Sequence, residues 1–316
     1  MSTLLVSSVG GHLAELHRLL PRLDGIDDER VWVTFDTPQS RSVLDGEQVR
    51  FVDYTGPRDY RNVLRHSLLA TRMFAGRHRF STVVSTGSGI ALSFLPIAGM
   101  RGARCHYIES ATRSEGPSLT GRMLSRFGRV SLYSQYRQWA EPPWMYAGSV
   151  FDTFAAGPRI TGTTSIARAV VTLGTMEDYE FRALVERALA VLPDDAEVLW
   201  QVGCTDVSGL PIAAHSQLPA RELNEAIAQA DVVIAHAGCG SSLDALAAGK
   251  KPVLVPRRSA YGENVDDHHA LIAAELDRRG LAVARSVDRL SSEDLLLAAS
   301  GSVRSEAAAA PFKLSD

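Results

Sequence analysis

Short runs of apolar and β-branched residues alternate with longer amphipathic stretches through both halves of the chain. This alternation is typical of βαβ units, whose parallel strands form a sheet that helices cover. The expected strands cover residues 4–9, 31–35, 49–52, 82–85, 105–108 and 130–133, then 169–173, 198–202, 232–235 and 252–255. The expected helices cover residues 12–23, 60–74, 89–100, 119–128, 179–192, 220–230, 241–248 and 265–277. The pattern predicts an α/β protein with two Rossmann-like domains and a cleft between them, with ligands at the carboxyl ends of the strands.

The boundary between the two domains is expected near residues 152–164, which are rich in Gly, Ala, Thr and Pro and are typical of a linker. At about 150 residues per domain, the 316 residues suffice for two. We expect a first domain over 1–155, a linker over 156–167 and a second domain over 168–316. The Ala-rich end of the chain, from residue 306, is expected to be helical.

Composition places the chain among ordinary globular proteins. Hydrophobic residues make up 45% and charged residues 22% of it, which excludes a disordered, collagen-like or coiled-coil chain. Cys105, Cys204 and Cys239 are too few and too scattered for a disulfide scaffold or a zinc module, and they favour a reducing, cytoplasmic environment. No charged segment of a signal peptide precedes the first expected helix. The longest apolar run, 90–100, is shorter than the ~20 residues that span a bilayer.

Positive charge is concentrated in the first half of the chain. Residues 1–160 carry 19 Arg and 14 acidic residues, whereas residues 161–316 carry 14 basic and 22 acidic ones. This asymmetry suggests an anionic partner for the first half, such as a membrane surface, a phosphate group or nucleic acid, although a solvated basic face explains it equally well. Nucleic acid is disfavoured because the arginines lack interleaved aromatic residues on which bases could stack.

The most informative segment is 232–246, VVIAHAGCGSSLDAL. A buried strand ends at His236, two glycines follow, and a helix is expected to start at Ser241. Glycines let backbone approach a ligand, and the free N–H groups and the dipole of a helix N-terminus favour phosphate. Ser241 and Ser242 could instead cap the helix. Asp244 could accept hydrogen bonds from a ribose, or it could simply complement the helix dipole. The segment matches neither Gly-x-Gly-x-x-Gly nor a P-loop.

A second glycine turn lies near the amino terminus, in Ser-Ser-Val-Gly-Gly-His at residues 7–12. It places His12 at the start of a helix, directly after a strand. The helix dipole there favours the neutral imidazole, which can take a proton from an attacking hydroxyl group. A histidine that only caps or packs is the alternative.

The segment from 232 to 269 resembles the donor-binding region of the family 28 GT-B glycosyltransferases, which include MurG-like enzymes and bacterial exopolysaccharide and dolichol-pathway transferases. The resemblance continues through Gly249-Lys250-Lys251-Pro252 and the run from Tyr261 to His269, where His269 replaces the usual Gln and Asp244 often corresponds to Glu. It extends from residue 4 to about 281 and joins in one chain two halves that some relatives carry on separate proteins. The resulting donor-binding set is Gly174, Thr175, Gln217, Leu218, His236, Gly238, Gly240, Ser241, Ser242, Asp244, Glu263, Asn264, Asp267 and His268.

Acceptor residues follow from the same resemblance in the first half. The expected acceptor-binding residues are Gly10, Gly11, Thr86, Gly87, Ser88, Gly89 and Arg122. Relatives carry the same Gly-Gly-His turn, which favours His12 as the general base. Glu109 lies in a segment that resembles a Glu-centred strand end of the family. It is the other candidate for the base or for a ligand of the acceptor hydroxyl, or else it pairs with an arginine.

The resemblance implies an inverting transfer of a hexose, such as GlcNAc or glucuronic acid, from a UDP-sugar to a hydroxyl group. The expected acceptor is a polyprenyl-diphosphate-linked saccharide of exopolysaccharide or cell-envelope synthesis at the inner face of the membrane. No cofactor is expected besides the UDP-sugar, and no metal ion, because the chain has no Asp-x-Asp pair and adjacent helical residues such as His268 and His269 point about 100° apart. The alternatives are a small-molecule acceptor, a UDP-sugar epimerase and a non-catalytic UDP-sugar-binding subunit.

Two expected helices combine arginines with apolar residues. Arg61, Arg65 and Arg72 lie on one of them, and Arg122, Arg126 and Arg129 recur at i, i+4 and i+7 on the other. Basic faces edged by apolar residues suit a helix at the surface of an anionic membrane. Ordinary amphipathic packing explains the apolar residues equally well.

Overall fold

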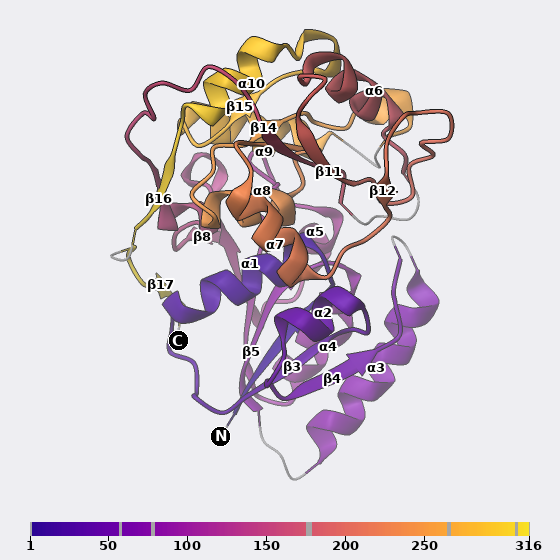
Figure 1. Cartoon of the computed structure of the whole chain (residues 1–316). Coiled ribbons are helices and arrows are strands. Elements are labelled where there is room, and N and C mark those ends of the chain that lie inside the picture. The colour runs from indigo at the N-terminus through magenta and orange to yellow at the C-terminus, as the bar shows by residue number, and fades with distance from the viewer. Residues whose placement is uncertain are drawn as a thin grey trace. The chain divides into compact units, whose positions relative to one another are not determined.

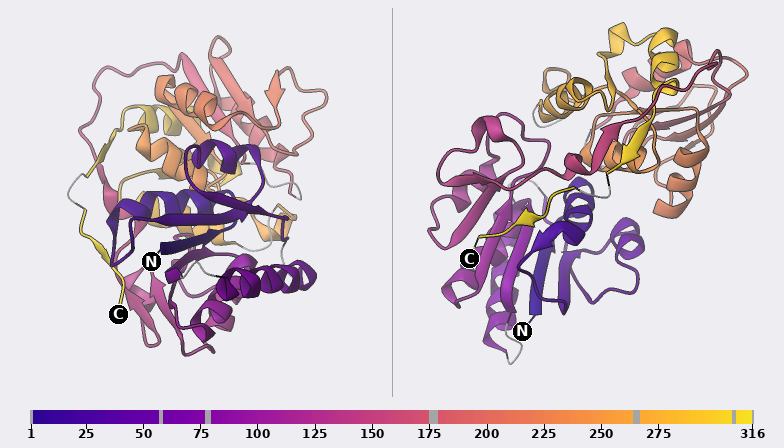
Figure 2. Two further views of the ribbon diagram at one scale, coloured as in Figure 1. Left: turned by 90° about the horizontal axis from the view of Figure 1, so that it is seen from below. Right: turned by 90° about the vertical axis from the view of Figure 1, so that its left-hand side faces the viewer.

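The computed structural model describes residues 2–56, 59–76, 80–174, 179–263, 267–306 and 309–315. The chain divides into two compact units (Figures 1 and 2). The first contains Met1–Val150 together with Ala309–Asp316, and the second contains Phe151–Ala308. The sequence-based boundaries differ from this division, because the second unit already begins at residue 151 and the last residues return to the first unit.

The first unit is built on a parallel sheet with the strand order β4-β3-β1-β5-β6-β7-β8. The strands are β1 (Ser2–Ser7), β3 (Arg30–Phe35), β4 (Val49–Val52), β5 (Phe80–Gly87), β6 (Arg104–Ile108), β7 (Val130–Ser134) and β8 (Trp144–Tyr146). Every residue of β1 is buried, as expected for a central strand whose sheet is covered on both faces. The sheet therefore forms the core of this unit.

The helices of the first unit connect these strands. They are α1 (Gly11–Leu19), α2 (Pro38–Val43), α3 (Tyr60–Ala75), α4 (Gly89–Met100) and α5 (Leu119–Leu124), with short 3-10 turns η1 (Leu20–Arg22) and η2 (Arg137–Trp139). Helix α4 is apolar on nearly all sides and is packed against α3 and the sheet. The expected helix over 119–128 is shorter than predicted, since α5 ends at Leu124, so Arg126 and Arg129 do not continue a helical face of Arg122.

The second unit repeats this plan with the strand order β12-β11-β10-β13-β14-β15. Its strands are β10 (Arg168–Thr172), β11 (Glu197–Gln201), β12 (Ala214–His215), β13 (Val232–Ala235), β14 (Val253–Leu254) and β15 (Val283–Ala284), all parallel. Its helices are α6 (Arg182–Val191), α7 (Ala220–Gln229), α8 (Cys239–Ala247), α9 (His268–Arg278) and α10 (Ser292–Ala299), with η3 (Val150–Thr153), η4 (Ser259–Tyr261) and η5 (Val287–Arg289). Strand β9 (Phe154–Ala156), next to the expected linker, pairs antiparallel with β16 (Val303–Ser305) near the end of the chain.

The carboxyl-terminal segment is extended, and the expectation of a helical tail is wrong. Strand β17 (Phe312–Lys313) pairs with β2 (Leu23–Asp24), and the yellow β17 arrow lies within the first unit in Figure 2. Phe312 is fully buried and its ring packs against Tyr133 at a centroid distance of 5.7 Å. Burial of one large aromatic side chain stabilises by about 1.5–3 kcal/mol, which explains why the segment is docked rather than helical.

Among the described residues, no helix is both long enough and apolar enough to cross a membrane.

Candidate functional site

Both sheets reverse their strand order at one place, and the candidate residues lie there. In the first sheet the connections diverge between β1 and β5, and in the second they diverge between β10 and β13. In open α/β sheets, ligands bind at the carboxyl ends of strands at such a switch point. His12 lies in the first turn of α1, which follows β1, and Gly87 is the last residue of β5. Gly174 and Gly238 lie in the loops after β10 and β13.

In the second unit, helix α8 presents an N-terminus without a side-chain cap. Gly238 is its N-cap residue, and the helix begins at Cys239 rather than at Ser241 as predicted. Ser242 does not cap it either, because its hydroxyl donates to the Gly238 carbonyl (2.8 Å). Gly240 and Ser241 are thus in the first turn, where backbone N–H groups point out of the helix and attract phosphate. The half-buried Asp244 follows one turn later.

The turn before α8 is strained and tightly packed. Ala237 has φ 62°, a left-handed conformation that costs a non-glycine residue about 1–3 kcal/mol and is found mainly at functional sites. The His236 ring lies against both Gly174 and Gly238. A Cβ at Gly174 would lie 2.7 Å from its Cε1 atom, and a Cβ at Gly238 would overlap the ring as well. The two loops can approach each other only because both positions are glycine.

The imidazole of His236 is held neutral by its surroundings. Burial lowers its pKa to about 3, with a further contribution from the positive charge of Arg257. Its Nδ1 atom lies 3.3 Å from the Thr172 carbonyl, and its ring contacts the His269 ring edge to face at 5.2 Å. A neutral ring adds no charge of its own to the field at the N-terminus of α8.

Arg257 organises this site, and the sequence analysis did not single it out. Its side chain is only 2% exposed and donates to the carbonyl groups of Leu173 (2.8 Å), Tyr179 (2.6 Å) and Glu263 (3.4 Å). It also lies over the Phe181 ring. Burial lowers the pKa of Arg257, so the protein stabilises a cation there at a cost. One guanidinium group therefore holds the segments that flank Gly174 and Glu263.

The predicted acids after β14 stabilise a turn. The carboxylate of Glu263 accepts from the Arg258 N–H (2.9 Å), and that of Asp267 accepts from the N–H (2.8 Å) and hydroxyl of Ser259. Burial raises the pKa of Glu263. His268 opens α9, and its ring contacts that of His269 at 4.6 Å. Among the described residues, no group of three or more His, Cys, Asp or Glu side chains could hold a metal ion.

The remaining donor candidates fall into two groups. Leu218 is buried, and its N–H donates to the side-chain oxygen of Gln201 (3.0 Å). The side-chain NH₂ group of Gln201 donates to the hydroxyl of Thr172 (3.0 Å). Gln201 thereby links the β12–α7 loop to β10, whereas Gln217 is exposed. Thr175 and Asn264 lie outside the described residues.

In the first unit, His12 is anchored to the carboxyl end of β5. Its Nδ1 atom lies 2.8 Å from the Thr86 carbonyl, and the Thr86 hydroxyl donates to the His12 carbonyl (2.7 Å). A carbonyl can only accept, so in the neutral ring the proton is on Nδ1 and the lone pair is on Nε2. Gly87 has φ 114°, and a Cβ there would lie 3.0 Å from the His12 Cε1 atom. The glycine is therefore required for the ring to lie where it does.

The other acceptor candidates surround this contact. Gly10 is the N-cap of α1, with φ 71°, and its N–H donates to Gln39 (2.9 Å), while Gly11 is the first residue of the helix. Ser88 is the N-cap of α4, which Gly89 begins, and it makes no side-chain capping bond. Arg122 is exposed and donates to the Pro117 carbonyl (3.3 Å).

Glu109 is buried and hydrogen-bonded, and among the described residues it forms no salt bridge with an arginine. It is 1% exposed. One carboxylate oxygen accepts from the N–H (2.9 Å) and hydroxyl (3.0 Å) of Ser118, and the other accepts from the Tyr107 hydroxyl and the Ser110 N–H (both 3.2 Å). Burial raises its pKa, and the bonds from Ser118 oppose that rise. This carboxylate fixes the start of α5, where Ser118 is the N-cap.

Glu15 is a second buried glutamate that sequence reasoning missed. It lies one turn after His12 on α1 and is fully buried. It accepts from the hydroxyl of Ser110 (2.6 Å), the N–H of Ala111 (2.9 Å) and the amide of Gln135 (2.9 Å). These bonds fix α1, and with it His12, against the loop after β6. The sequence offered one signal for this role, which is an acidic residue at a helix position that faces the core.

Solved structures with this architecture place the chain in a fold class. MurG from Acinetobacter baumannii matches with a TM-score of 0.56 at 18% identity, covering 94% of this chain and 89% of that one. The glycosyltransferase SnogD from Streptomyces nogalater matches with 0.56 at 20% identity, covering 94% and 90%. UDP-GlcNAc 2-epimerase from Methanocaldococcus jannaschii matches with 0.59 at 10% identity, covering 94% and 91%. The chain has the GT-B fold of two Rossmann-like domains, and the predicted fold class is confirmed in this respect.

Sequence comparison finds a family model that matches the second part of the chain. Residues 168–314 match the model of the glycosyltransferase family 28 C-terminal domain. Over 242 residues the chain is 29% identical to the UDP-N-acetylglucosamine–N-acetylmuramyl-(pentapeptide) pyrophosphoryl-undecaprenol N-acetylglucosamine transferase of Alcanivorax borkumensis. The alignment covers 70% of this chain and spans 64% of that relative. The predicted resemblance to family 28 and MurG is thus confirmed.

Proposed function

We propose that the protein is an inverting glycosyltransferase that transfers a hexose from a UDP-sugar to a hydroxyl group, without a metal ion or a cofactor. The observation that carries this proposal is the uncapped N-terminus of α8 at the β10/β13 switch point, inside the segment that matches the family 28 model. A helix N-terminus of this kind favours a diphosphate. Asp244, one turn further, is suited to accept from a ribose.

The acceptor is assigned to the first unit, with His12 as general base. In the proposed reaction, the acceptor oxygen attacks the anomeric carbon and its proton passes to Nε2 of His12. The bond between the anomeric carbon and the UDP oxygen breaks, and its electron pair leaves with UDP. Attack from the opposite side inverts the anomeric centre through an oxocarbenium-like state. The N–H groups of α8 stabilise the charge on the leaving diphosphate.

Glu109 is proposed as a positioning residue in this scheme. Its carboxylate accepts hydrogen bonds from Ser118, Ser110 and Tyr107, and its burial leaves little room for an acceptor hydroxyl. His12 offers the better combination, because its Nδ1 contact with Thr86 fixes the tautomer that can take a proton. The roles of Gly10, Gly11, Ser88, Gly89 and Arg122 toward the acceptor remain part of the proposal.

UDP should stabilise the protein against heat. At about 100 times its Kd, a ligand adds about 2.7 kcal/mol, which corresponds to a rise in Tm of about 5 °C or more. We expect one UDP-sugar, from a panel that includes UDP-GlcNAc and UDP-glucuronic acid, to raise the Tm more than UDP does. Gly238→Ala, which brings a Cβ into the His236 ring, should lose most of the shift. Gly128→Ala is the matched control, because its Cβ would meet no atom within 4 Å.

The same assay separates the proposal from its alternatives. No Tm shift with any UDP-sugar would contradict it. Conversion of a UDP-sugar without an acceptor would indicate an epimerase, and binding without transfer to any acceptor would indicate a non-catalytic subunit.

A polyprenyl-diphosphate-linked saccharide is the proposed acceptor, on the inner face of the cell membrane. GlcNAc transfer to such a lipid is what the name of the Alcanivorax relative describes. The surface that supports membrane contact is on α3, labelled in Figure 1. Its exposed stripe combines Arg61, Arg65 and Arg72 with Leu64 (65% exposed) and Leu68 (58%). Apolar side chains flanked by arginines suit an anionic lipid surface.

Binding to lipid vesicles tests this surface. The protein should sediment with phosphatidylcholine vesicles that contain phosphatidylglycerol, and less with phosphatidylcholine alone. Leu68→Glu should weaken that binding about tenfold. The change removes an apolar side chain that would insert into the lipid, and it adds a negative charge that the anionic lipid repels. Leu297→Glu makes the same change at an exposed leucine of α10 and should have no effect. Equal binding of all three proteins would contradict a role for α3 and favour a small-molecule acceptor.

A further inference from the structure

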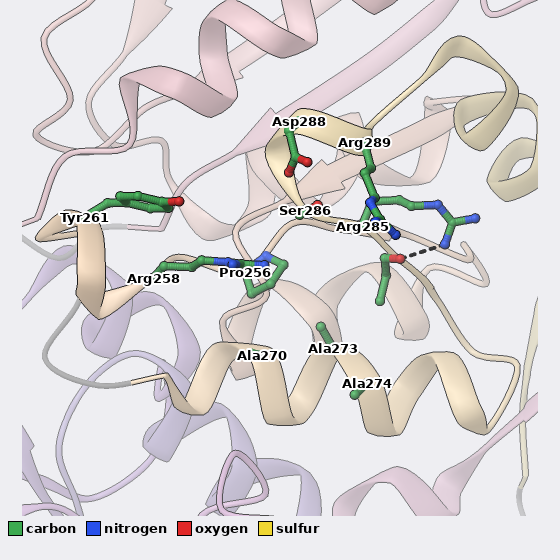
Figure 3. Close-up of a pocket in the computed structure, with 11 residues that line it drawn as sticks. Pro256, Arg258, Tyr261, Ala270, Ala273, Ala274, Arg285, Ser286, Asp288 and Arg289 are labelled. Atoms are coloured by element: carbon green, nitrogen blue, oxygen red, sulfur yellow. Dashed lines mark hydrogen bonds between the residues drawn. The ribbon is translucent and has the colours of Figure 1, made fainter.

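A pocket of about 810 Å³ lies in the second unit beside the turn that Glu263 and Asp267 hold (Figure 3). It is bounded by the segment after β14, by α9 and by the segment that follows β15. Its size is within the range of small-molecule sites, which is about 300–1,000 Å³. Neither the proposed reaction nor the donor-binding residues use it.

The charges of this pocket are predominantly positive. Three arginines, Arg258, Arg285 and Arg289, line it with a single acid, Asp288. Arg285 is already engaged, since it pairs with Asp294 (2.8 Å) and bends away to the Ala284 carbonyl (Figure 3). Arg258 and Arg289 form no salt bridge or side-chain hydrogen bond with any other described residue, although their positive charges contribute, after the hydrogen bond from Ser286, to the lowered pKa of Asp288. Two guanidinium groups therefore remain to receive a ligand.

The sticks in Figure 3 show Arg258 and Arg289 entering the pocket from different segments, with Asp288 beside Arg289. Arg258 follows β14, and Arg289 ends η5. Such planar donors match the oxygen atoms of phosphate, which they bind through two parallel hydrogen bonds. Two of them reaching one space from separate elements fit a group with several anionic oxygens better than a single carboxylate.

The rest of the lining is small and apolar or aromatic. Ala270, Ala273 and Ala274 of α9 form one wall, and they leave room that longer side chains would fill. Tyr261 is 73% exposed at the rim. An exposed tyrosine ring offers a face on which a flat or apolar part of a ligand can pack. The pocket thus combines a phosphate-binding end with an apolar end.

We propose that this pocket is a second binding site, separate from the α8 N-terminus, for a free phosphate ester whose organic part packs on Tyr261 and the alanines of α9. Arg258 and Arg289 bind the phosphate group. Asp288 limits its affinity by repulsion. The proposal does not depend on the sugar-transfer reaction, because it rests on the pocket alone.

Calorimetric titration with phenyl phosphate and with inorganic phosphate tests the proposal. Phenyl phosphate should bind more tightly than inorganic phosphate, and Tyr261→Ala should remove the difference. The double variant Arg258→Gln/Arg289→Gln should bind phenyl phosphate at least about tenfold more weakly, since hydrogen bonds to charged groups are lost. Asp288→Asn should bind it about two- to fivefold more tightly, because a nearby repulsive charge is removed.

Arg221→Gln is the matched control for charge, since Arg221 is exposed on α7 and its one ion pair among the described residues is with Glu225 (2.8 Å). Its binding should equal that of the unmodified protein. Phosphate that binds at the N-terminus of α8 does so in all of these variants. Differences in affinity between the variants therefore measure binding in the pocket. Unchanged affinity in the double variant would overturn the proposal, and so would equal affinities of Asp288→Asn and the unmodified protein. Displacement of phenyl phosphate by phosphatidic acid vesicles would overturn its assignment to a free ester.

Discussion

His12→Asn should lower turnover about 100- to 10,000-fold, the contribution typical of a general base. The asparagine amide can still donate to the Thr86 carbonyl, as Nδ1 of His12 does over 2.8 Å, but it cannot take a proton. The loop geometry should therefore survive while the chemistry is lost. Steady-state kinetics with the preferred UDP-sugar measures the effect, and the Kd of UDP should stay within about twofold, because His12 belongs to the first unit.

The control for this variant is His17→Ala. His17 is an exposed histidine on the same helix, and its replacement should leave turnover close to that of the unmodified protein. Full activity of His12→Asn would remove His12 from the mechanism. A loss of UDP affinity equal to the loss of turnover would mean that the histidine acts on the structure and not on the proton.

Arg257→Leu should destabilise the protein by about 2–4 kcal/mol and weaken UDP binding. The carbonyl groups of Leu173, Tyr179 and Glu263 would lose a charged donor, which costs about 1–3 kcal/mol for each buried group left unpaired. Part of this loss is offset, since the buried cation no longer has to be desolvated. UDP binding should weaken because Leu173 precedes Gly174. Urea unfolding and UDP titration measure the two effects.

Arg221→Leu is the matched comparison for stability. Its exposed pair with Glu225 is of a kind that contributes less than about 1 kcal/mol, so the midpoint of unfolding should scarcely move. If Arg257→Leu were as stable as the unmodified protein and bound UDP equally well, the three carbonyl contacts would not support the site.

Regular elements with strong patterns were predictable from the sequence. The expected strand 232–235 and helix 89–100 coincide with β13 and α4, because continuous apolar runs have one favourable arrangement in a covered parallel sheet. Shorter elements were missed. Strands β12 and β15 have two residues each, α2 has six, and α10 begins with a capping box at Ser291 that the analysis did not use.

The candidate site was predictable where it depends on local turns and not where it depends on distant contacts. The turns around His12 and Gly238 follow from glycines next to apolar strands. By contrast, Arg257 and Glu15 are important because of partners far along the chain, such as Leu173 and Gln135. Sequence alone gives such residues the appearance of ordinary surface charges. For Glu109 the sequence suggested a partner that the structure does not show. Its hydrogen bonds come from serines, a tyrosine and backbone, and not from the arginines that lie near it in sequence.

The docked β17 strand has a consequence for dissecting the protein. The first unit is discontinuous in sequence, so a fragment cut after Val150 would lack Phe312, which packs against Tyr133, and would leave β2 without its neighbouring strand. Separate study of that unit calls for a design in which residues 309–315 are rejoined to it by a synthetic connection, or are supplied as a peptide in trans.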